Sequence, residues 1–367
     1  MPFDAPPSAQ SRAPSSTGAT PRAIALWLLG VAGMVWAMVA IGGATRLTGS
    51  GLSIMEWAPL SGALPPVSDA EWNRLYALYR TIPQYALVNQ GFGIEGFKQI
   101  FWLEWIHRFW GRLIGLAYAL PLAWFWIRGR IPAGLKPRLL GLLVLGGLQG
   151  AVGWFMVASG FEADRTVVSP YRLVMHLGLA LLLFAALTWT GLGLLRPRPA
   201  EAGPGFAGLR RQVKAAAWLL VGAMLAGGFV AGNRAGLDYN TFPLMAGAVV
   251  PEGYWRLSPG WTNLTANIAT VQFNHRLLAT LAGLAALGAA VTAARRLAPG
   301  FARTACLGLG AAVLLQYSLG VATLLARVPP WLGTLHQACA VLVLGMALLA
   351  LNGLRPPVAK RRPDIGQ

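Results

Sequence analysis

The stretch RLVMHLGLALLLFAALTWTGLGLL, residues 172–195, carries one arginine at its start and one histidine, and its other side chains are uncharged. An apolar run of about 20 residues is long enough to cross a bilayer as an α-helix. Seven further runs of this kind occur along the chain. The eight runs predicted as transmembrane helices are 24–44, 105–127, 139–158, 172–195, 214–233, 272–294, 304–325 and 332–354.

The composition agrees with this prediction. Of the 367 residues, 56% are hydrophobic and only 11% are charged. Soluble globular domains carry about 25% charged residues, so an ordinary soluble domain is excluded. The sequence therefore predicts an all-α integral membrane protein with eight transmembrane helices.

Basic residues are concentrated in alternate connections between the apolar runs. Connections 128–138, 196–214 and 295–303, together with the two terminal tails, hold 18 of the 30 Lys and Arg residues. Loops rich in Lys and Arg stay in the cytoplasm, so these connections and both termini are predicted to be cytoplasmic. The formal net charge of +18 then reflects membrane topology, and no nucleic-acid partner is implied.

The chain ends are predicted to form tails, and the two cysteines to lie in the helix core. Residues 1–22 are rich in Pro, Ser and Ala and are predicted to form a disordered cytoplasmic tail, and residues 356–367 form a basic cytoplasmic tail. Cys306 and Cys339 fall at or inside the last two apolar runs. A disulfide would be expected in an outer loop, so both cysteines are interpreted as small core residues.

The sequence contains an internal duplication. Residues 51–66, GLSIMEWAPLSGALPP, correspond to residues 236–251, GLDYNTFPLMAGAVVP, and each stretch follows the first run of its half. The other matched positions are His107-Arg108 with His275-Arg276, Gln149 and Gly153 with Gln316 and Gly320, and His176 with His336. Because each half has four helices, both halves share one orientation. Two tandem four-helix bundles, residues 23–200 and 201–355, are therefore predicted, related by a pseudo-twofold axis along the membrane normal.

The chain has only four histidines, His107, His176, His275 and His336, and each lies near the start of an even-numbered run. Even-numbered runs cross from outside to inside, so all four imidazoles are predicted near the outer leaflet. Ionisable groups within a bilayer are costly and are usually functional. We therefore expect the N-terminal pair, His107 and His176, and the C-terminal pair, His275 and His336, each to bind one group.

A heme is the group that suits two imidazoles in a helix bundle. Zinc and copper sites require further Cys, His or carboxylate ligands at close spacing, and the sequence offers none. A heme requires one or two axial nitrogens, an apolar slot and cations for its propionates. Arg108 and Arg276, each next to a histidine, are predicted to bind propionates, and the alternative is that they extend to the membrane interface.

The two halves differ beside the histidines. Glu104 lies three residues before His107 and shares its helix face, whereas the corresponding residue of the C-terminal half is Gln272. A buried carboxylate is suited to proton transfer. The asymmetry predicts a reactive site in the N-terminal half and an electron-relay site in the C-terminal half. The alternative is that Glu104 only forms a surface ion pair with Arg108 or Lys98.

These motifs resemble those of the heme A synthase family, in the form found in mitochondria and related bacteria. The resemblance covers residues 24–354 and rests on five features. They are GGATRLTGSGLSIMEW at 42–57, NQGFGIEGFKQIFWLEWIHR at 89–108, FNHR at 273–276, and the runs that contain His176 and His336. Some bacterial relatives carry a cysteine pair in an outer loop, and this chain does not.

The resemblance implies an activity and roles for the site residues. The family oxidises a ring methyl of heme O to a formyl group, through two hydroxylations and loss of water, to give heme A for cytochrome oxidase. His275 and His336 would be axial ligands of a permanent heme b, and His107 and His176 would flank the substrate heme. Glu104 would be the essential acid.

The resemblance also implies a location and partners. The protein would lie in the cell inner (plasma) membrane, with its heme sites toward the outer (periplasmic) leaflet. Heme O synthase (protoheme farnesyltransferase), cytochrome oxidase assembly factors and an unidentified electron donor or acceptor are the expected partners. A homo-oligomer is left open.

Two other functions suit part of the pattern. A diheme b-type cytochrome that only transfers electrons would also use duplicated four-helix units, but a transmembrane electron path would stack its hemes across the bilayer, not toward one leaflet. A heme transporter or chaperone would require an alternating pathway, for which the sequence has no signal.

Overall fold

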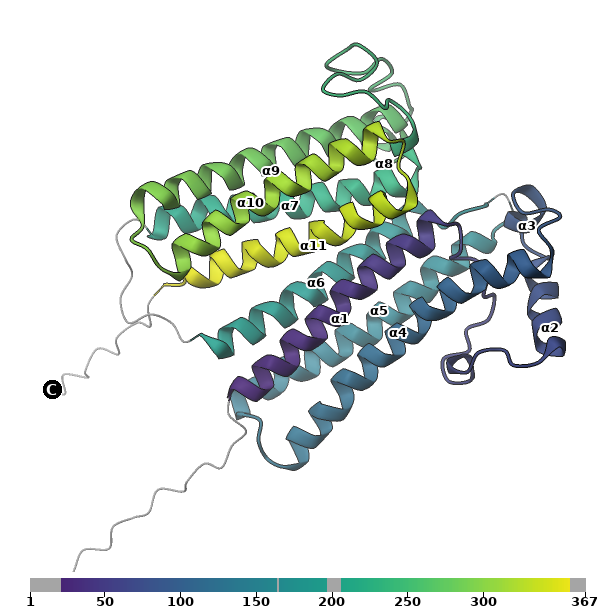
Figure 1. Cartoon of the computed structure of the whole chain (residues 1–367), viewed down its shortest axis with the longest axis horizontal. Helices are drawn as coiled ribbons and strands as arrows, with labels where there is room; N and C mark the ends of the chain where they lie inside the picture. The colour runs from purple at the N-terminus through teal and green to yellow at the C-terminus, as the bar shows by residue number, and fades with distance from the viewer. Residues whose placement is uncertain (1–20, 164, 197–205, 357–367) are drawn as a thin grey trace, which may run out of the picture.

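The computed structural model describes residues 21–163, 165–196 and 206–356 (Figure 1). Helices account for most of these residues, and no β-strand occurs among them, which confirms the all-α class. The expected N-terminal tail and nearly all of the basic C-terminal tail lie outside the described residues. The helices are α1 (Pro21–Leu47), α2 (Asp69–Tyr79), α3 (Pro83–Leu87), α4 (Gly93–Ile127), α5 (Lys136–Ala158), α6 (Pro170–Leu195), α7 (Phe206–Gly232), α8 (Asn263–Ala266), α9 (Ile268–Arg296), α10 (Phe301–Leu325) and α11 (Pro330–Gly353).

Seven helices in the described part of the chain are long and apolar enough to cross a membrane, namely α1, α5, α6, α7, α9, α10 and α11. The protein is therefore a multi-pass membrane protein. The eighth expected span, 105–127, forms the C-terminal part of α4, a helix of 35 residues. Arg112 and several tryptophans make this part less apolar than the other seven helices, so α4 as a membrane span stays a prediction.

The helix α4 begins at Gly93, twelve residues before the expected run. Its additional turns bury Phe97 and Phe101 against Trp72 and other aromatic side chains of the outer loop. Burial of these rings stabilises a helical segment that is too polar to be recognised as a membrane span. As a result, His107 lies well inside its helix and not in the first turns.

The long loop between α1 and α4 contains two short helices, α2 and α3. Ser68 caps α2, because its side chain accepts a hydrogen bond from the backbone N–H of Glu71 at 3.2 Å. The chain leaves the helical conformation at Ile82, the residue before Pro83. The residue before a proline is disfavoured in the α region, so α3 starts as a separate helix.

The long helices form two groups that lie side by side (Figure 1). The first group consists of α1, α4, α5 and α6, and the second of α7, α9, α10 and α11. The groups meet along α1, α6, α7 and α11. At this junction the Trp36 indole donates to the Ala338 carbonyl at 3.0 Å, and the Gln337 amide donates to the Val39 carbonyl at 3.0 Å. Helices α1 and α11 are therefore tied together by polar bonds as well as by apolar packing.

Helix α5 is the least buried of the seven apolar helices. Only 6% of the most apolar part of α5 is buried, against 28% of α10, its counterpart in the duplication. In the second group, a row of small residues on α9 allows close approach of the neighbouring helices. These residues are Ala282, Ala286, Ala289 and Ala293.

Candidate heme site

The structure brings each predicted histidine pair together. His107 on α4 and His176 on α6 are close enough to interact electrostatically, and so are His275 on α9 and His336 on α11. Within the first group, α4 and α6 both pack on α1 and on α5, so the two histidines come from diagonally placed helices. The second pair has the same arrangement, with α7 and α10 between its helices.

Each imidazole rests against a glycine of a flanking helix. A Cβ atom at any of these positions would lie 2.9 or 3.0 Å from the nearest ring atom, closer than at least nine in ten real Cβ contacts. We call them the ring glycines. They are Gly42 behind His107, Gly153 behind His176, Gly227 behind His275 and Gly320 behind His336. The absent side chains leave space for the ring, and this fits a planar ligand held between two imidazoles.

The imidazoles of His107 on α4 and His275 on α9 differ in their hydrogen bonding. Nδ1 of His275 lies 2.9 Å from the Ala223 carbonyl oxygen. A carbonyl only accepts, so Nδ1 carries the proton and Nε2 keeps the lone pair that binds a metal. His107 turns its Nε2 edge toward Gly42 and has no side-chain hydrogen bond within the described residues. In the C-terminal half the ring of His275 is therefore held with its Nε2 lone pair available, and the ring of His107 is less constrained.

The donor set also fits a heme. Across the described ranges, no three His, Cys, Asp or Glu side chains come together as a metal site. Cys306 is buried in the core of the second group, as expected for a small core residue. Two imidazoles per half, each with an apolar backing, are a donor set for the axial positions of a heme iron.

Glu104 is buried, with 2% of its surface exposed, and both of its oxygens accept hydrogen bonds from the chain. Oε2 accepts from the backbone N–H and the hydroxyl of Ser53, both at 2.7 Å, and from the backbone N–H of Ile54 at 3.0 Å. Oε1 accepts two bonds from Arg108, at 2.6 and 3.0 Å. Lys98 pairs with Glu95 instead. The ion pair with Arg108 exists, but it is buried and not at the surface.

Residues 53–59, which we call the strap, run along α4 beside His107. Arg108 donates to the carbonyls of Ile54 at 2.6 Å and Glu56 at 2.9 Å. One turn further along α4, Arg112 donates to the carbonyls of Ala58 at 2.7 Å and Pro59 at 2.9 Å. The two guanidinium groups therefore fasten the strap to α4 through its backbone.

The strap also reaches α5. The rings of Trp57 and Trp154 meet edge to face with centroids 5.1 Å apart, and Arg108 lies 5.5 Å from the Trp154 ring centre. Trp154 directly follows Gly153, the glycine behind His176. The strap thus connects the two helices that flank the outer end of the N-terminal site.

An exposed ion-pair cluster holds the other side of the strap. Arg74 of α2 donates to both carboxylate oxygens of Glu56, at 2.9 and 2.8 Å, and also pairs with Glu71. The hydrogen bond from Arg74 holds the pKa of Glu56 below its ordinary value of 4.5. The stabilisation is therefore present above pH 4.5 and is lost as the pH falls through the lowered pKa. Both groups are largely exposed, so the contribution is small.

In the C-terminal half, Gln272 takes the place of Glu104 and also binds the preceding loop. It donates hydrogen bonds to the backbone of that loop, whereas Glu104 accepts them. The buried Gln272 amide donates to the carbonyls of Ala235 at 2.7 Å and Asp238 at 2.6 Å. Its oxygen accepts from Arg276 at 2.7 Å, as Glu104 accepts from Arg108. The Glu104 carboxylate is thus paired with backbone N–H groups, and the Gln272 NH₂ group is paired with backbone carbonyls. Arg108 and Arg276 are both engaged by the outer loops, and their predicted binding of propionates stays a prediction.

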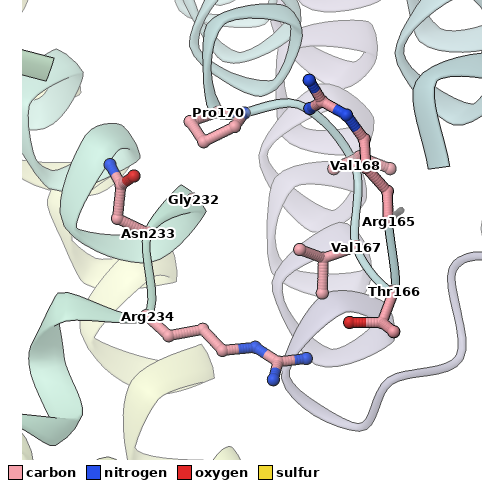
Figure 2. Close-up of a pocket in the computed structure, with 8 residues that line it drawn as sticks. All are labelled: Arg165, Thr166, Val167, Val168, Pro170, Gly232, Asn233 and Arg234. Atoms are coloured by element: carbon pink, nitrogen blue, oxygen red, sulfur yellow. The ribbon is translucent and has the colours of Figure 1, made fainter. Parts of the chain in front are cut away.

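A cavity of about 320 Å³ opens between the segment before α6 and the end of α7 (Figure 2). Arg165 and Arg234 line it from these two segments, and none of the four histidines does. Arg165 already pairs with Glu162 at 2.9 Å. The cavity is therefore separate from the histidine pairs.

Sequence reasoning missed several residues of the site. The ring glycines Gly42 and Gly227 were not singled out, although the register that matches the outer-loop motifs also matches these two positions. No role was predicted for Arg112. Its partners, and that of His275, are backbone carbonyls, which leave no signal in the sequence.

Comparison with known proteins agrees with this geometry. A family model described as cytochrome oxidase assembly protein matches residues 25–348. The chain is 58% identical to the heme A synthase of Granulibacter bethesdensis over 332 residues, which cover 90% of this chain and 87% of that relative. It is 48% identical to the heme A synthase of Rhodospirillum centenum over 349 residues, covering 95% of this chain and 93% of the relative. For the heme A synthase of Parvibaculum lavamentivorans the identity is 48% over 338 residues, covering 92% and 96%. The chain belongs to the heme A synthase family.

Proposed function

We propose that this protein is a heme A synthase, which oxidises a ring methyl of heme O to a formyl group. Two successive hydroxylations and loss of water give the formyl group, and the product, heme A, serves cytochrome oxidase. The observation that carries the proposal is the 58% identity to a curated heme A synthase across 90% of the chain. The paired imidazoles, each backed by a glycine, agree with a heme substrate.

We assign the substrate to the N-terminal group and a permanent heme b to the C-terminal group. A heme b on His275 and His336 would supply one-electron redox chemistry. The bond from His275 to the Ala223 carbonyl favours a stable ligand there, and the unbound ring of His107 favours a ligand that exchanges. The small buried fraction of α5 supports entry of a farnesylated substrate from the lipid.

Glu104, His107 and His176 form the proposed reactive site. Glu104 shares a helix face with His107 and would hold or release a proton at its carboxylate while the substrate methyl is oxidised. Arg108 and Arg276 would bind propionates by exchanging the backbone carbonyls that they now contact. The strap, which Arg112 would still hold through the Ala58 and Pro59 carbonyls, would exclude water from the N-terminal site.

The membrane arrangement completes the proposal. We place α4 as an eighth span, so that the chain forms two tandem four-helix bundles in the cell inner membrane. Both termini are cytoplasmic, and the heme sites lie toward the periplasmic leaflet. Heme O synthase, oxidase assembly factors and an electron donor or acceptor are the proposed partners.

Expression with a heme O synthase tests the function directly. Extracted pigments should contain heme A, because the chain would convert the supplied heme O. A culture that expresses heme O synthase alone is the control. If both cultures contain heme O as their only farnesylated pigment, the proposal is wrong, and the diheme electron carrier is favoured.

Trp57→Ala should weaken closure of the N-terminal site without affecting the C-terminal one. Loss of an edge-to-face ring pair costs about 1 kcal/mol, or about fivefold in a rate. Heme A yield should fall by up to that factor while the heme b content of purified protein stays constant. The matched control is Trp261→Ala, because this outer-loop tryptophan is 62% exposed. An equal fall in both variants would show that the strap has no specific role.

A further inference from the structure

Two glutamines occupy equivalent positions beside the histidines of α6 and α11. Nε2 of Gln149 on α5 lies 3.2 Å from Nδ1 of His176 and 3.4 Å from its Nε2, so Nδ1 is the nearer ring nitrogen. Nε2 of Gln316 on α10 lies 3.0 Å from Nδ1 of His336. Each amide nitrogen also donates to the backbone carbonyl of its histidine, at 3.1 and 3.0 Å respectively. Each glutamine stands one helical turn before the ring glycine of the same histidine. Two copies of one geometry indicate a shared role.

The amide orientation decides which ring nitrogen carries the proton. An amide NH₂ that faces Nδ1 makes this nitrogen an acceptor, so a neutral imidazole keeps its proton on Nε2. An imidazole in this tautomer has no Nε2 lone pair for a metal. If the amide oxygen faces Nδ1, the proton lies on Nδ1 and Nε2 is free to bind iron.

The oxygen that would do this has no other partner. Oε1 of Gln149 and Oε1 of Gln316 are both buried and accept no hydrogen bond within the described residues. A buried polar atom without a partner is destabilising. If the amide turns, Oε1 gains the Nδ1 proton as a partner, but the amide nitrogen gives up its bond to the histidine backbone carbonyl. Binding of iron by the freed Nε2 must supply the difference.

We propose that Gln149 and Gln316 are positioning residues that select the iron-binding tautomer of His176 and His336. When a heme enters, each amide turns about its Cγ–Cδ bond and presents Oε1 to Nδ1. The imidazole stays neutral throughout, because Nε2 gives up one proton and Nδ1 takes up one. This inference rests on the proposed binding of a heme by each histidine pair.

The contrast with His275 supports the assignment. The Ala223 carbonyl that faces Nδ1 of His275 belongs to a helix backbone and cannot turn, so this tautomer is fixed. The C-terminal pair therefore combines one fixed ligand with one selected by Gln316. In the N-terminal pair His107 has no acceptor for Nδ1 among the described residues, so Gln149 is the one group that sets a tautomer there.

Gln316→Met in the full chain, purified with its heme b, tests the inference. Methionine keeps the length of the side chain and removes both amide atoms. Loss of the Nδ1 acceptor makes the imidazole a weaker donor to ferric iron, so the reduction potential of heme b should rise. Loss of an outer-shell partner of a metal ligand typically weakens binding about 10-fold or more, and heme b retention should fall accordingly.

Gln337→Met is the matched control, because Gln337 neighbours His336 in sequence but donates to the Val39 carbonyl of α1. It should leave the potential and the electron paramagnetic resonance spectrum of ferric heme b unchanged. Unchanged potential and retention in Gln316→Met, or the same shift in Gln337→Met, would overturn the inference. Wild-type protein without any heme b would overturn the proposed function instead.

Gln149→Met provides a second test if the Gln316→Met protein does not accumulate. Titration of the purified full chain with hemin, followed in the Soret band, reports binding to the N-terminal pair. We expect affinity about 10-fold weaker than in the wild type. Equal affinity would refute the role of the glutamine in this half.

Discussion

Gly320→Ala should remove most of the heme from the C-terminal half. The new methyl group would lie 2.9 Å from Cε1 of His336, so the ring must move. Gln316 contacts the same ring and the backbone carbonyl of His336, which leaves it few alternative positions. A displaced ligand no longer aligns Nε2 with the iron, and we expect heme b per protein to fall about 10-fold or more. Soret absorbance relative to protein concentration measures this loss.

Gly288→Ala is the control for this prediction. Gly288 lies in α9, and no atom outside its local helix comes within 4 Å of the position that a Cβ would take. Alanine favours a helix over glycine by about 1 kcal/mol, so this variant should keep its heme and its stability. If Gly320→Ala also keeps its heme, the ring glycine does not hold His336 in its binding position.

The N-terminal half offers a closer comparison on one helix. Gly153 lies behind His176, whereas Gly150, less than one turn away on α5, has no atom within 4 Å of a built Cβ. Gly153→Ala should reduce heme A yield and hemin binding, and Gly150→Ala should reduce neither. The two substitutions change the helix propensity equally, so only the contact with the imidazole distinguishes them.

Most long helices could be predicted from the sequence because their stability in a membrane depends on length and composition alone. The run predicted at 172–195 is observed as α6, Pro170–Leu195. The run predicted at 304–325 is observed as α10, Phe301–Leu325. Helix α4 departs from this rule. Its first turns are held by aromatic packing with the outer loop, and this depends on residues about twenty positions away.

The site was predictable where it depends on side-chain chemistry. The histidine pairs follow from the scarcity of histidine and from the duplication, and the structure brings both pairs together. The strap was not predictable, because its bonds to Arg108 and Arg112 end on backbone carbonyls. A ring glycine such as Gly42 looks like ordinary helix packing until the imidazole behind it is placed.

The largest effect is expected from Glu104→Gln. The Glu104 carboxylate accepts five hydrogen bonds, and an amide has only one acceptor atom. Its NH₂ group must face either the backbone donors of the strap or the guanidinium of Arg108. In both orientations two donors oppose each other, and Arg108 loses the carboxylate charge that pairs with it. Breaking a buried ion pair costs about 3–5 kcal/mol, and the proton function proposed for this carboxyl is lost as well.

We expect heme A yield in Glu104→Gln to fall about 100-fold or more, measured in pigments from cells that supply heme O. Strap release should accompany this fall and should be visible as new proteolytic cleavage between residues 50 and 68. Ser53→Ala is the control, because it removes one of the five bonds and keeps the carboxylate. This variant should cost about 1 kcal/mol and leave the yield within about twofold.

Cleavage and yield together separate the two roles of Glu104. Arg112→Met removes the bonds to the Ala58 and Pro59 carbonyls and so loosens the strap, but it keeps the carboxyl group, whereas Glu104→Gln removes both. If the two variants cleave alike and only Glu104→Gln loses heme A, the carboxyl acts in proton transfer. If both lose heme A to the same extent, fastening of the strap accounts for the effect. Undiminished yield in Glu104→Gln would remove the residue from the mechanism, because neither a proton donor nor a fastened strap would then be required for oxidation of the methyl group.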